Sequence, residues 1–394
     1  MKRGLALEGG GARGAYHIGV VKAYRENGYE FDGYVGTSIG AVNAAILAQG
    51  DFEKAKELWQ KISLEQLFNI DDQLLLTISE AKLNKDTAIN LGRSLKRLFT
   101  GGGFDTSKMK KYLSSYLDED KIRKSGKDFG LVTYSLDERK PYEVHLEDIV
   151  EGKLISYIMA SASLPFFKSE VIDEKKFIDG GVYNNCPVTL LAEKKYDEII
   201  AVRLGNFGII RKVKGNAKVT VITPRDDLGD LLHFDPDNSK FHLELGYYDG
   251  LRAIKNLRGF HYYLEPVKLD DIYNRLIGMD DSFILELGEI LDVKELPPKR
   301  VLFEEIIPQI GAYLKLKKDF DYADFLIGLL EEVALKKDIS RFAVYSFESF
   351  IRLIKKTPDK KTEESLIEKV INLSFSHKKN LVADKLVHFL LTGL

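Results

Sequence analysis

The chain has 394 residues, a length that usually folds as one large domain with a smaller one, or as two domains. Its formal net charge is −2, which excludes a global basic field for binding nucleic acid. The single cysteine, Cys186, excludes a disulfide within the chain and favours a reducing compartment.

Targeting and membrane-spanning signals are not found in the sequence. Residues 1–8 lead through a short apolar segment into glycines and lack the long apolar stretch of a signal peptide. No run of roughly 18 apolar residues occurs, so we expect no spanning helix. The seven histidines and one cysteine show no zinc-type spacing. We therefore expect a cytoplasmic protein without a metal site, and peripheral contact with the inner membrane surface remains open.

The first fifty residues predict alternating strands and helices. Residues 4–7 are typical of a short buried strand that leads into a glycine loop, and the apolar spacing over residues 16–24 predicts a helix. Residues 34–35 predict a second short strand, and the small apolar residues 41–48 predict a buried helix. This order indicates the α/β class, with a parallel sheet and helical layers.

Residues 51–125 are expected to be mostly helical. Within them, residues 82–99 carry leucines at helical spacing among arginines and lysines, which is the pattern of a basic amphipathic helix. Such a helix either packs over the core with a solvated basic side, which we favour, or lies as a lid on an anionic membrane surface. The triplet Gly101-Gly102-Gly103 that follows is either a hinge or an ordinary loop.

Strand signals continue through the middle of the chain. Residues 129–146 predict a β-hairpin, and a helix is expected near residues 151–160. Residues 199–204 and 219–222 predict two further buried strands.

From about residue 265 the pattern is charged, amphipathic and helical, with Pro297-Pro298 as a helix breaker. We therefore predict two domains, residues 1–264 and residues 265–394. The second is expected to be a helical accessory region that caps a substrate cleft or forms a homodimer.

The segment Gly36-Thr37-Ser38-Ile39-Gly40 matches the pattern G-x-S-x-G. In a turn from strand to helix, this pattern places the serine on a strained, exposed corner, and the glycines remove side chains that would clash there. The helix after the turn points its N-terminus at the serine, which favours a developing negative charge. An ordinary N-cap serine is the alternative interpretation of Ser38.

A glycine loop precedes this motif, Gly9-Gly10-Gly11-Ala12-Arg13-Gly14. Successive glycines let backbone N–H groups converge on an anion, so in an acyl hydrolase this loop would form the oxyanion hole. The spacing also fits the G-x-G-x-x-G pattern of dinucleotide-binding folds, with Asp32 near the distance expected for a ribose-binding acid. A tight loop without a ligand is the third interpretation, and the residues alone leave all three open.

A third motif, Asp179-Gly180-Gly181, follows an apolar pair. Asp179 could act as the base for Ser38, although a turn-forming aspartate is the favoured interpretation of this motif alone. The usual pKa of an aspartate is about 3.9, so burial beside Ser38 would be needed to make it an effective base. Histidine is the more common base, and His17 and His233 are the best candidates, although neither carries a triad signature.

The three motifs, in this order and spacing, resemble those of patatin-like phospholipases from about residue 4 to at least residue 190. Two further segments support the resemblance: residues 160–165, similar to an Ala-Ser…Pro segment, and residues 184–188, similar to Asn-x-Pro-[Val/Ile]. The resemblance implies a three-layer α/β/α fold and a Ser-Asp dyad without histidine. It also favours the oxyanion interpretation of the glycine loop over the dinucleotide one.

The resemblance implies hydrolysis of acyl esters, commonly of phospholipids, without a cofactor or calcium. Ser38 would be the nucleophile and Asp179 the base. The expected oxyanion donors are Gly9, Gly10, Gly11 and Ile39; the loop is supported by Ala12, Arg13 and Gly14; the two turns are shaped by Gly36, Gly40, Gly180 and Gly181. Arg13 either holds the loop in shape, which we favour, or attracts a phosphate headgroup.

Three alternatives remain at this stage. A carboxylesterase or thioesterase would act on smaller acyl groups through the same residues. A nucleotide-binding protein would use the loop of residues 9–14. A lipid-binding protein without catalysis would have no need for both Ser38 and Asp179.

Overall fold

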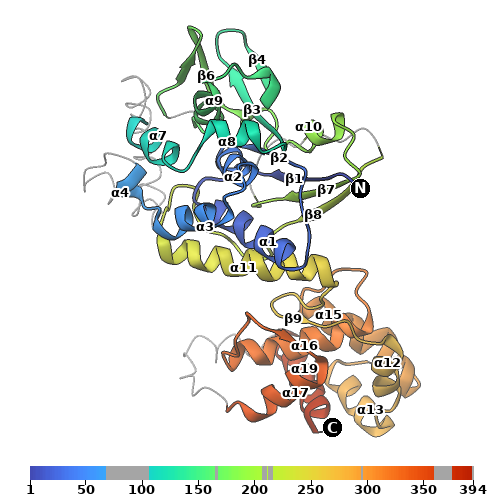
Figure 1. The fold of residues 1–394 in the computed structure, drawn as a ribbon. Helices are drawn as coiled ribbons and strands as arrows, with labels where there is room; N and C mark the ends of the chain where they lie inside the picture. Colours follow the sequence, from blue (N-terminus) through green and yellow to red (C-terminus); the bar gives the residue numbers. More distant parts are fainter. Residues whose placement is uncertain are drawn as a thin grey trace. The chain divides into compact units, whose positions relative to one another are not determined.

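The computed structural model describes residues 1–67, 106–164, 167–205, 211, 216–293, 296–358 and 375–392. They divide into two compact units, Met1–Leu251 and Arg252–Leu394 (Figure 1). The basic amphipathic helix predicted for residues 82–99 and the glycine triplet after it lie outside the described residues.

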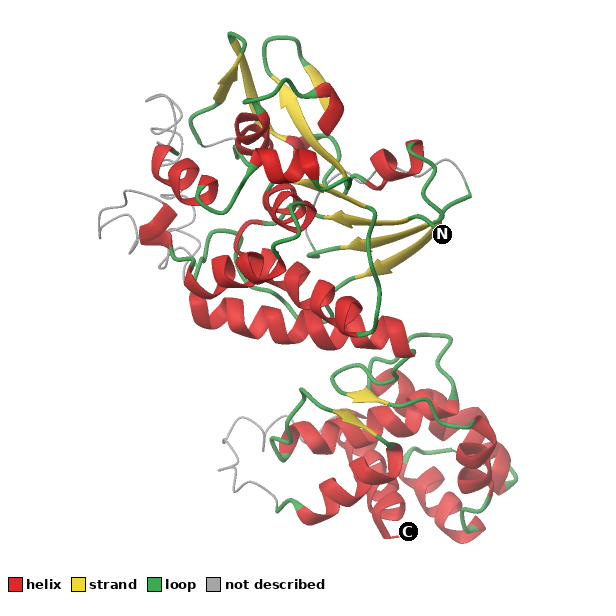
Figure 2. Cartoon of the chain, in the orientation of Figure 1, coloured by secondary structure: helices red, strands yellow, loops and turns green. Residues whose placement is uncertain are grey.

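Within the described residues, the first unit is built on an eight-stranded mixed sheet (Figure 2). Its strands are β1 (Arg3–Leu7), β2 (Gly33–Thr37), β3 (Asp128–Ser135), β4 (Lys140–His145), β5 (Glu170–Ile172), β6 (Lys175–Asp179), β7 (Glu198–Val202) and β8 (Lys218–Ile222). They are ordered β5-β6-β3-β2-β1-β7-β8, and β4 also pairs with β3. The pairs β1–β2, β2–β3, β1–β7 and β7–β8 are parallel, whereas β3–β4, β3–β6 and β5–β6 are antiparallel. The parallel pairing predicted from the first fifty residues is confirmed by β1 and β2, and the β-hairpin predicted for residues 129–146 is confirmed by β3 and β4.

The helices of this unit are α1 (Ala15–Glu26), α2 (Ile39–Ala48), α3 (Phe52–Lys61), α4 (Leu64–Leu67), α7 (Ser107–Ser114), α8 (Glu119–Lys124), α9 (Leu154–Ser161), α10 (Val188–Glu193) and most of α11 (Pro236–Lys255). Alternation along the strands decides which face each helix covers. Ala6 and Val35 share a core with Leu190 and Leu191 of α10, whereas Gly36 lies against α2 on the other face. The expected three-layer α/β/α architecture is therefore confirmed.

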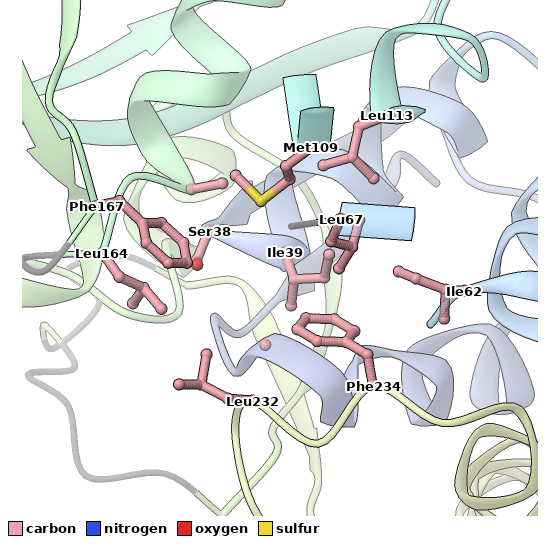
Figure 3. Close-up of a pocket in the computed structure, with 12 residues that line it drawn as sticks. Ser38, Ile39, Ile62, Leu67, Met109, Leu113, Leu164, Phe167, Leu232 and Phe234 are labelled. Carbon is pink, nitrogen blue, oxygen red and sulfur yellow. The ribbon is translucent and has the colours of Figure 1, made fainter. Parts of the chain in front are cut away.

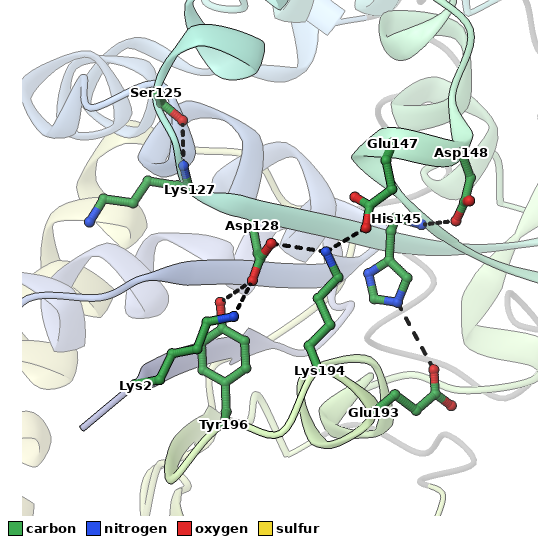
Figure 4. Close-up of polar contacts among 10 residues, drawn as sticks. All are labelled: Lys2, Ser125, Lys127, Asp128, His145, Glu147, Asp148, Glu193, Lys194 and Tyr196. Carbon is green, nitrogen blue, oxygen red and sulfur yellow. Dashed lines mark hydrogen bonds and ion pairs between the residues drawn. The ribbon is translucent and has the colours of Figure 1, made fainter.

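Polar side chains hold the amino-terminal end of the sheet together. Asp128, the first residue of β3, accepts hydrogen bonds from Lys2 at 2.8 Å, Lys194 at 2.9 Å and Tyr196 at 2.7 Å (Figure 4). Partial burial raises the pKa of Asp128, but the three hydrogen bonds outweigh it and hold that pKa well below its usual range. This end of the sheet is occupied by structural ion pairs. The carboxyl ends of the parallel strands, where α/β folds usually bind ligands, lie opposite.

The second unit, Arg252–Leu394, is mainly helical. It contains β9 (Tyr263–Leu264), α12 (Leu269–Ile277), α13 (Asp281–Ile290), α14 (Pro298–Arg300), η4 (Val301–Ile306), α15 (Ile307–Tyr313), α16 (Tyr322–Lys336), β10 (Val344–Tyr345), α17 (Phe347–Lys356) and α19 (Phe375–Thr392). Their apolar faces form one core. Pro298 is the first residue of α14, a position where the missing N–H costs no helical hydrogen bond.

The boundary between the units falls earlier in the chain than the sequence suggested. The expected boundary followed residue 264, whereas the observed second unit begins at Arg252. Tyr262 and Leu264 lie in the core of the second unit, and β9 pairs with β10. The apolar segment before residue 265 therefore belongs to the helical unit.

The second unit buries the carboxylate of Glu331 on α16. Its Oε1 accepts the N–H groups of Phe260 at 2.8 Å, His261 at 2.9 Å and Tyr262 at 2.8 Å. Burial raises the pKa of Glu331, and these hydrogen bonds oppose the rise without cancelling it. Glu331 thus fastens the loop before β9 to α16.

Candidate active site

Ser38 stands at the corner between β2 and α2, with φ 56° and ψ −130°. Residues other than glycine rarely adopt this backbone conformation, which costs roughly 1–3 kcal/mol and persists only when the surroundings enforce it. The surroundings do so by close packing of strand and helix. A Cβ on Gly36 would lie 2.2 Å from the main chain of Gly40, and a Cβ on Gly40 would lie 2.3 Å from the Leu7 carbonyl oxygen.

The register of three strands brings the ends of β2 and β6 together. β4 pairs with residues 130–135 and therefore occupies one edge of β3 along this stretch. β2 and β6 must share the other edge: β2 ends with Thr37 opposite Val132, and β6 ends with Asp179 opposite Thr133. Because Val132 and Thr133 are consecutive, the corner that follows β2 meets the end of β6.

Asp179 is only 4% exposed at this meeting point. Its Oδ1 accepts the Gly181 N–H at 2.7 Å, and its Oδ2 has no hydrogen-bond partner among the described residues. Burial raises the pKa of Asp179 to about 6, with smaller opposing effects from the Ser38 hydroxyl and the Gly181 N–H. The two side chains are close enough for this effect, although they do not form a hydrogen bond of ordinary geometry. A carboxylate with a pKa nearer neutrality is a better proton acceptor for a hydroxyl.

The turn after Asp179 also requires a residue without a side chain. A Cβ on Gly180 would start 2.1 Å from the Val132 carbonyl oxygen. The two glycines thus have different tasks, because Gly180 permits the close approach to β3 and Gly181 supplies the N–H that holds Asp179.

The glycine loop follows the carboxyl end of β1. The Gly9 N–H donates to the Asn185 carbonyl oxygen at 2.9 Å, so this group is already used within the protein. The N–H groups of Gly10, Gly11 and Ile39 have no acceptor in the part of the chain that the structure describes. Of the four expected oxyanion donors, Gly9 therefore has its N–H occupied within the fold, and the other three stay predictions.

The loop lies directly against the corner at Ser38. A Cβ on Gly9 would lie 2.5 Å from Asn185 Oδ1 and 3.0 Å from Ser38 Cβ. Gly11 has φ +54°, and a Cβ there would lie 2.0 Å from the Leu231 carbonyl oxygen. A side chain at Gly9 would push the loop away from Ser38, and one at Gly11 would clash with the main chain of Leu231.

The residues expected to support the loop hold it to neighbouring segments. The Ala12 N–H donates to the Leu231 carbonyl oxygen at 2.8 Å. Arg13 Nε donates to the Gly229 carbonyl oxygen at 2.8 Å, and its Nη1 donates to the Leu204 carbonyl oxygen at 3.4 Å. These contacts agree with a structural role for Arg13 rather than a headgroup site.

Asn43 of α2 anchors the end of the loop. Its Nδ2 donates to the Gly14 carbonyl oxygen at 2.9 Å and lies 3.2 Å from His17 Nδ1, while its Oδ1 accepts the Trp59 Nε1–H at 2.9 Å. Burial lowers the pKa of His17 to about 3, so this ring is neutral and packed in the interior. Neither His17 nor the exposed His233 lines the pocket at Ser38. The structure thus brings neither candidate histidine into that pocket.

Ser38 lies in an apolar pocket (Figure 3). Its walls come from widely separated segments: Ile62, Leu67, Met109, Leu113, Ala162, Leu164, Phe167, Leu232 and Phe234. Among the described lining residues, only Ser38 has a side chain with a hydroxyl, amide or charged group. The pocket therefore suits an apolar ligand chain that ends at the Ser38 hydroxyl.

Asp32 does not lie where a ribose-binding acid would be needed. It precedes β2, and its Oδ2 accepts the Arg3 N–H at 2.8 Å at the amino-terminal end of the sheet. The glycine loop follows β1 at the carboxyl end. Loop and acid are therefore at opposite ends of the sheet, which does not fit the dinucleotide interpretation.

Three polar residues at the site were not singled out from the sequence. Ser161 accepts the Ser38 N–H at 2.9 Å, and Asn185 Nδ2 donates to the Gly9 carbonyl oxygen at 3.3 Å. Both lie in the segments that supported the family resemblance, which was the available signal. Asn43 could have been noticed as the one polar residue in the apolar run 41–48.

The fold and the arrangement of the motifs define an α/β protein with a serine corner at the carboxyl end of its sheet. Residues 5–192 match the family model of patatin-like phospholipase. Patatin-like phospholipase domain-containing protein 7 of Rattus norvegicus is 26% identical over 205 residues, which cover 51% of this chain and 13% of that protein. Lysophospholipase NTE1 of Kluyveromyces lactis is 24% identical over 315 residues, 75% of this chain and 20% of that protein. The first unit therefore carries a patatin-like phospholipase domain over residues 5–192.

The chain thus spans only a minor part of the length of these two relatives. VipD of Legionella pneumophila aligns over 99% of this chain and 90% of its own, with 15% identity and a TM-score of 0.40, too low to support an inference. Among the described residues, no helix is long and apolar enough to cross a bilayer. The same residues contain no group of three or more His, Cys, Asp or Glu side chains that could hold a metal ion.

Proposed function

We propose that the first unit is a lipid acyl hydrolase of the phospholipase A type, with Ser38 as nucleophile and Asp179 as its base. One observation carries the proposal. The strained Ser38 corner meets a buried carboxylate whose pKa is raised to about 6, and Ser38 lies in an apolar pocket. The match of residues 5–192 to patatin-like phospholipase supports lipid esters as the substrate class.

In the acylation step, Asp179 Oδ2 takes the proton of the Ser38 hydroxyl while Ser38 Oγ bonds to the ester carbonyl carbon. The electron pair of the C=O double bond moves onto its oxygen and forms a tetrahedral oxyanion. When this intermediate collapses, the bond to the alcohol oxygen breaks, and the leaving alcohol receives the proton from Asp179. The product is an acyl-Ser38 ester.

The oxyanion is stabilised by the N–H groups of Gly10, Gly11 and Ile39. These groups have no acceptor among the described residues, and Gly11 and Ile39 line the same pocket as Ser38. Ile39 is the first residue of α2, so the positive end of the helix dipole adds to the effect. Each donor of this kind contributes about 10²- to 10³-fold to turnover.

In the deacylation step, Asp179 takes a proton from a water molecule whose oxygen bonds to the acyl carbonyl carbon. When the bond to Ser38 Oγ then breaks, Asp179 returns the proton to that oxygen, and the fatty acid and the Ser38 hydroxyl are released. The acyl chain lies in the apolar pocket among Met109, Phe167 and Leu232. Burial of its methylene groups favours binding by about 0.8 kcal/mol each. We therefore expect medium or long acyl chains to be preferred over short ones.

Hydrolysis by wild type and by Ser38→Ala tests this function. Phosphatidylcholine in mixed micelles and a short-chain p-nitrophenyl ester serve as substrates, and circular dichroism checks folding. We expect fatty acid release from the phospholipid by wild type and a loss of about 10³-fold or more in the variant. Equal rates for the two proteins would contradict the proposal. Turnover of the short ester alone would favour the esterase or thioesterase alternative.

A further inference from the structure

Ser161, the last residue of α9, lies between the nucleophile corner and β3. The Ser38 N–H donates to Ser161 Oγ at 2.9 Å, and the Ser161 hydroxyl donates to the Val132 carbonyl oxygen at 2.7 Å. Ser161 is 0% exposed, so water does not reach these two hydrogen bonds from the surface. One hydroxyl therefore satisfies two main-chain groups in the interior.

The Ser161 hydroxyl replaces one main-chain hydrogen bond between β2 and β3. β2 and β3 pair in parallel up to Thr37 opposite Val132. In a regular parallel ladder, the next N–H of β2 would donate directly to the Val132 carbonyl oxygen. That N–H belongs to Ser38, and the Ser161 hydroxyl is inserted between donor and acceptor. The chain can thus leave β3 at Ser38 while both main-chain groups stay hydrogen-bonded.

The same short segment also holds the other member of the dyad. The Ser163 carbonyl oxygen accepts the Asp179 N–H at 2.7 Å. Ala162, between the two serines, lines the apolar pocket. Residues 161–163 therefore contact the main chain of both Ser38 and Asp179 and form one wall of the space in which they meet.

We infer that Ser161 is a positioning residue, which fixes the direction of the Ser38 main chain and so the approach of Ser38 Oγ to Asp179. The inference rests on the proposed acyl hydrolase function. Ser38 needs such a holder because its φ of 56° is strained. Because the Ser38 N–H donates to Ser161, the Ile39 N–H is the main-chain group at this corner that can bind the oxyanion.

The test compares the full-length wild type with Ser161→Ala, Ser161→Cys and Ser135→Ala. Ser135 is a matched control, because it is a buried serine on β3 whose Oγ accepts the Glu138 N–H at 3.2 Å, away from the dyad. A fluorophosphonate that labels reactive serines counts active sites, so that kcat is expressed per labelled site. This normalisation removes the effect of unfolded protein from the comparison.

We expect Ser161→Ala to lower kcat per labelled site by about 10- to 100-fold, with KM changed less than about twofold. Ser161→Cys, which keeps a weaker hydrogen-bonding group, should lie between wild type and Ser161→Ala. Ser135→Ala should match wild type. If Ser161→Ala does not fold, Ser161→Cys decides, and it should still be slower than wild type.

Two results would overturn the inference, and they are distinguishable. If wild type is active and Ser161→Ala has the same kcat per labelled site, Ser161 has no positioning role, and the proposed function is unaffected. Where Ser161→Ala does not fold, an unchanged kcat for Ser161→Cys leads to the same conclusion. A folded wild type with neither turnover nor labelling removes the proposed function and the positioning role together.

Discussion

Two buried carboxylates, one in each unit, have different surroundings. Asp179 and Glu331 are both 4% exposed. Glu331 Oε1 accepts three main-chain N–H groups, whereas Asp179 accepts one, and its Oδ2 has no partner among the described residues. Burial alone therefore does not mark a functional site. A buried carboxylate whose hydrogen-bonding capacity is used by the fold is structural, and one with an idle oxygen beside a strained serine is available for chemistry.

A third buried carboxylate in the first unit supports this distinction. Glu8 follows β1 and is 0% exposed. Its Oε1 lies 3.1 Å from Arg203 Nη2, and its Oε2 accepts the Leu204 N–H. Both oxygens are therefore hydrogen-bonded, so Glu8 is a structural carboxylate like Glu331, although it lies in the same unit as Asp179.

Replacement of the carboxylate by an amide should abolish most of the activity at Asp179 and leave it unchanged at Glu331. Asp179→Asn removes the proposed proton acceptor while it keeps the shape of the side chain, so acyl ester hydrolysis should fall by about 10³-fold or more. Glu331→Gln keeps an oxygen for the three N–H groups and should retain the wild-type rate. Steady-state hydrolysis by the two variants checks this. Comparable losses in both variants would contradict the distinction.

Removal of the oxygen at position 331 should instead affect stability. Glu331→Met has a similar volume but no acceptor for the N–H groups of Phe260, His261 and Tyr262, which should destabilise the second unit by about 3 kcal/mol. Glu331→Gln is the matched control and should change the free energy of unfolding by less than about 1 kcal/mol. Urea unfolding followed by circular dichroism measures both. A methionine variant as stable as wild type would show that the three hydrogen bonds are not needed.

Ionisation of the buried Asp179 carboxyl group should make the first unit less stable at neutral pH than at acid pH. The pKa of Asp179 is raised from 3.8 to about 6 on folding, so between these values the folded state binds more protons. The stability that this group contributes is present below pH 3.8 and is lost as the pH rises through about 6. The loss amounts to about 3 kcal/mol at most.

Asp179→Asn removes this dependence. The variant should be more stable than wild type at pH 8 by up to about 3 kcal/mol, and the difference should vanish near pH 4. Unfolding by urea at the two pH values measures it. A variant that is less stable than wild type at pH 8 would show that the ionised carboxylate stabilises the fold.

The smallest expected effect is the pH dependence of the rate. In the proposed mechanism Asp179 must be ionised to accept the Ser38 proton, so kcat/KM should fall about tenfold for each pH unit below its pKa of about 6. Glu331→Gln should leave this profile unchanged. A profile that is flat from pH 5 to pH 8 would be inconsistent with Asp179 as the base.

Local features of the site were predictable from the sequence. The order of strands, glycine loop, corner and helix in the first fifty residues agrees with β1, η1 (Gly11–Gly14), α1, β2 and α2. These elements depend on glycine spacing and apolar periodicity, which act between residues close in the chain. The position of Asp179 after a strand was likewise readable from its motif.

The relations between distant segments were not predictable. The meeting of Ser38 and Asp179 depends on β2 and β6 sharing one edge of β3, and no local pattern encodes that register. The use of the Gly9 N–H by Asn185 depends on a contact between residues far apart in the chain. For the same reason, the unit boundary was placed too late, because the core contacts of Tyr262 and Leu264 are with helices that follow them.

The mass of the intact chain during turnover tests most directly whether the protein is an acyl hydrolase that uses Ser38 and Asp179. Wild type, Ser38→Ala and Asp179→Asn are mixed with a slowly hydrolysed fatty acyl ester, quenched in acid and measured by mass spectrometry with peptide mapping. We predict that wild type gains the mass of one acyl group, located on Ser38, and that neither variant gains it in the same time. An acyl group on another residue, or turnover of wild type without any acyl adduct, would contradict a Ser38–Asp179 acyl hydrolase.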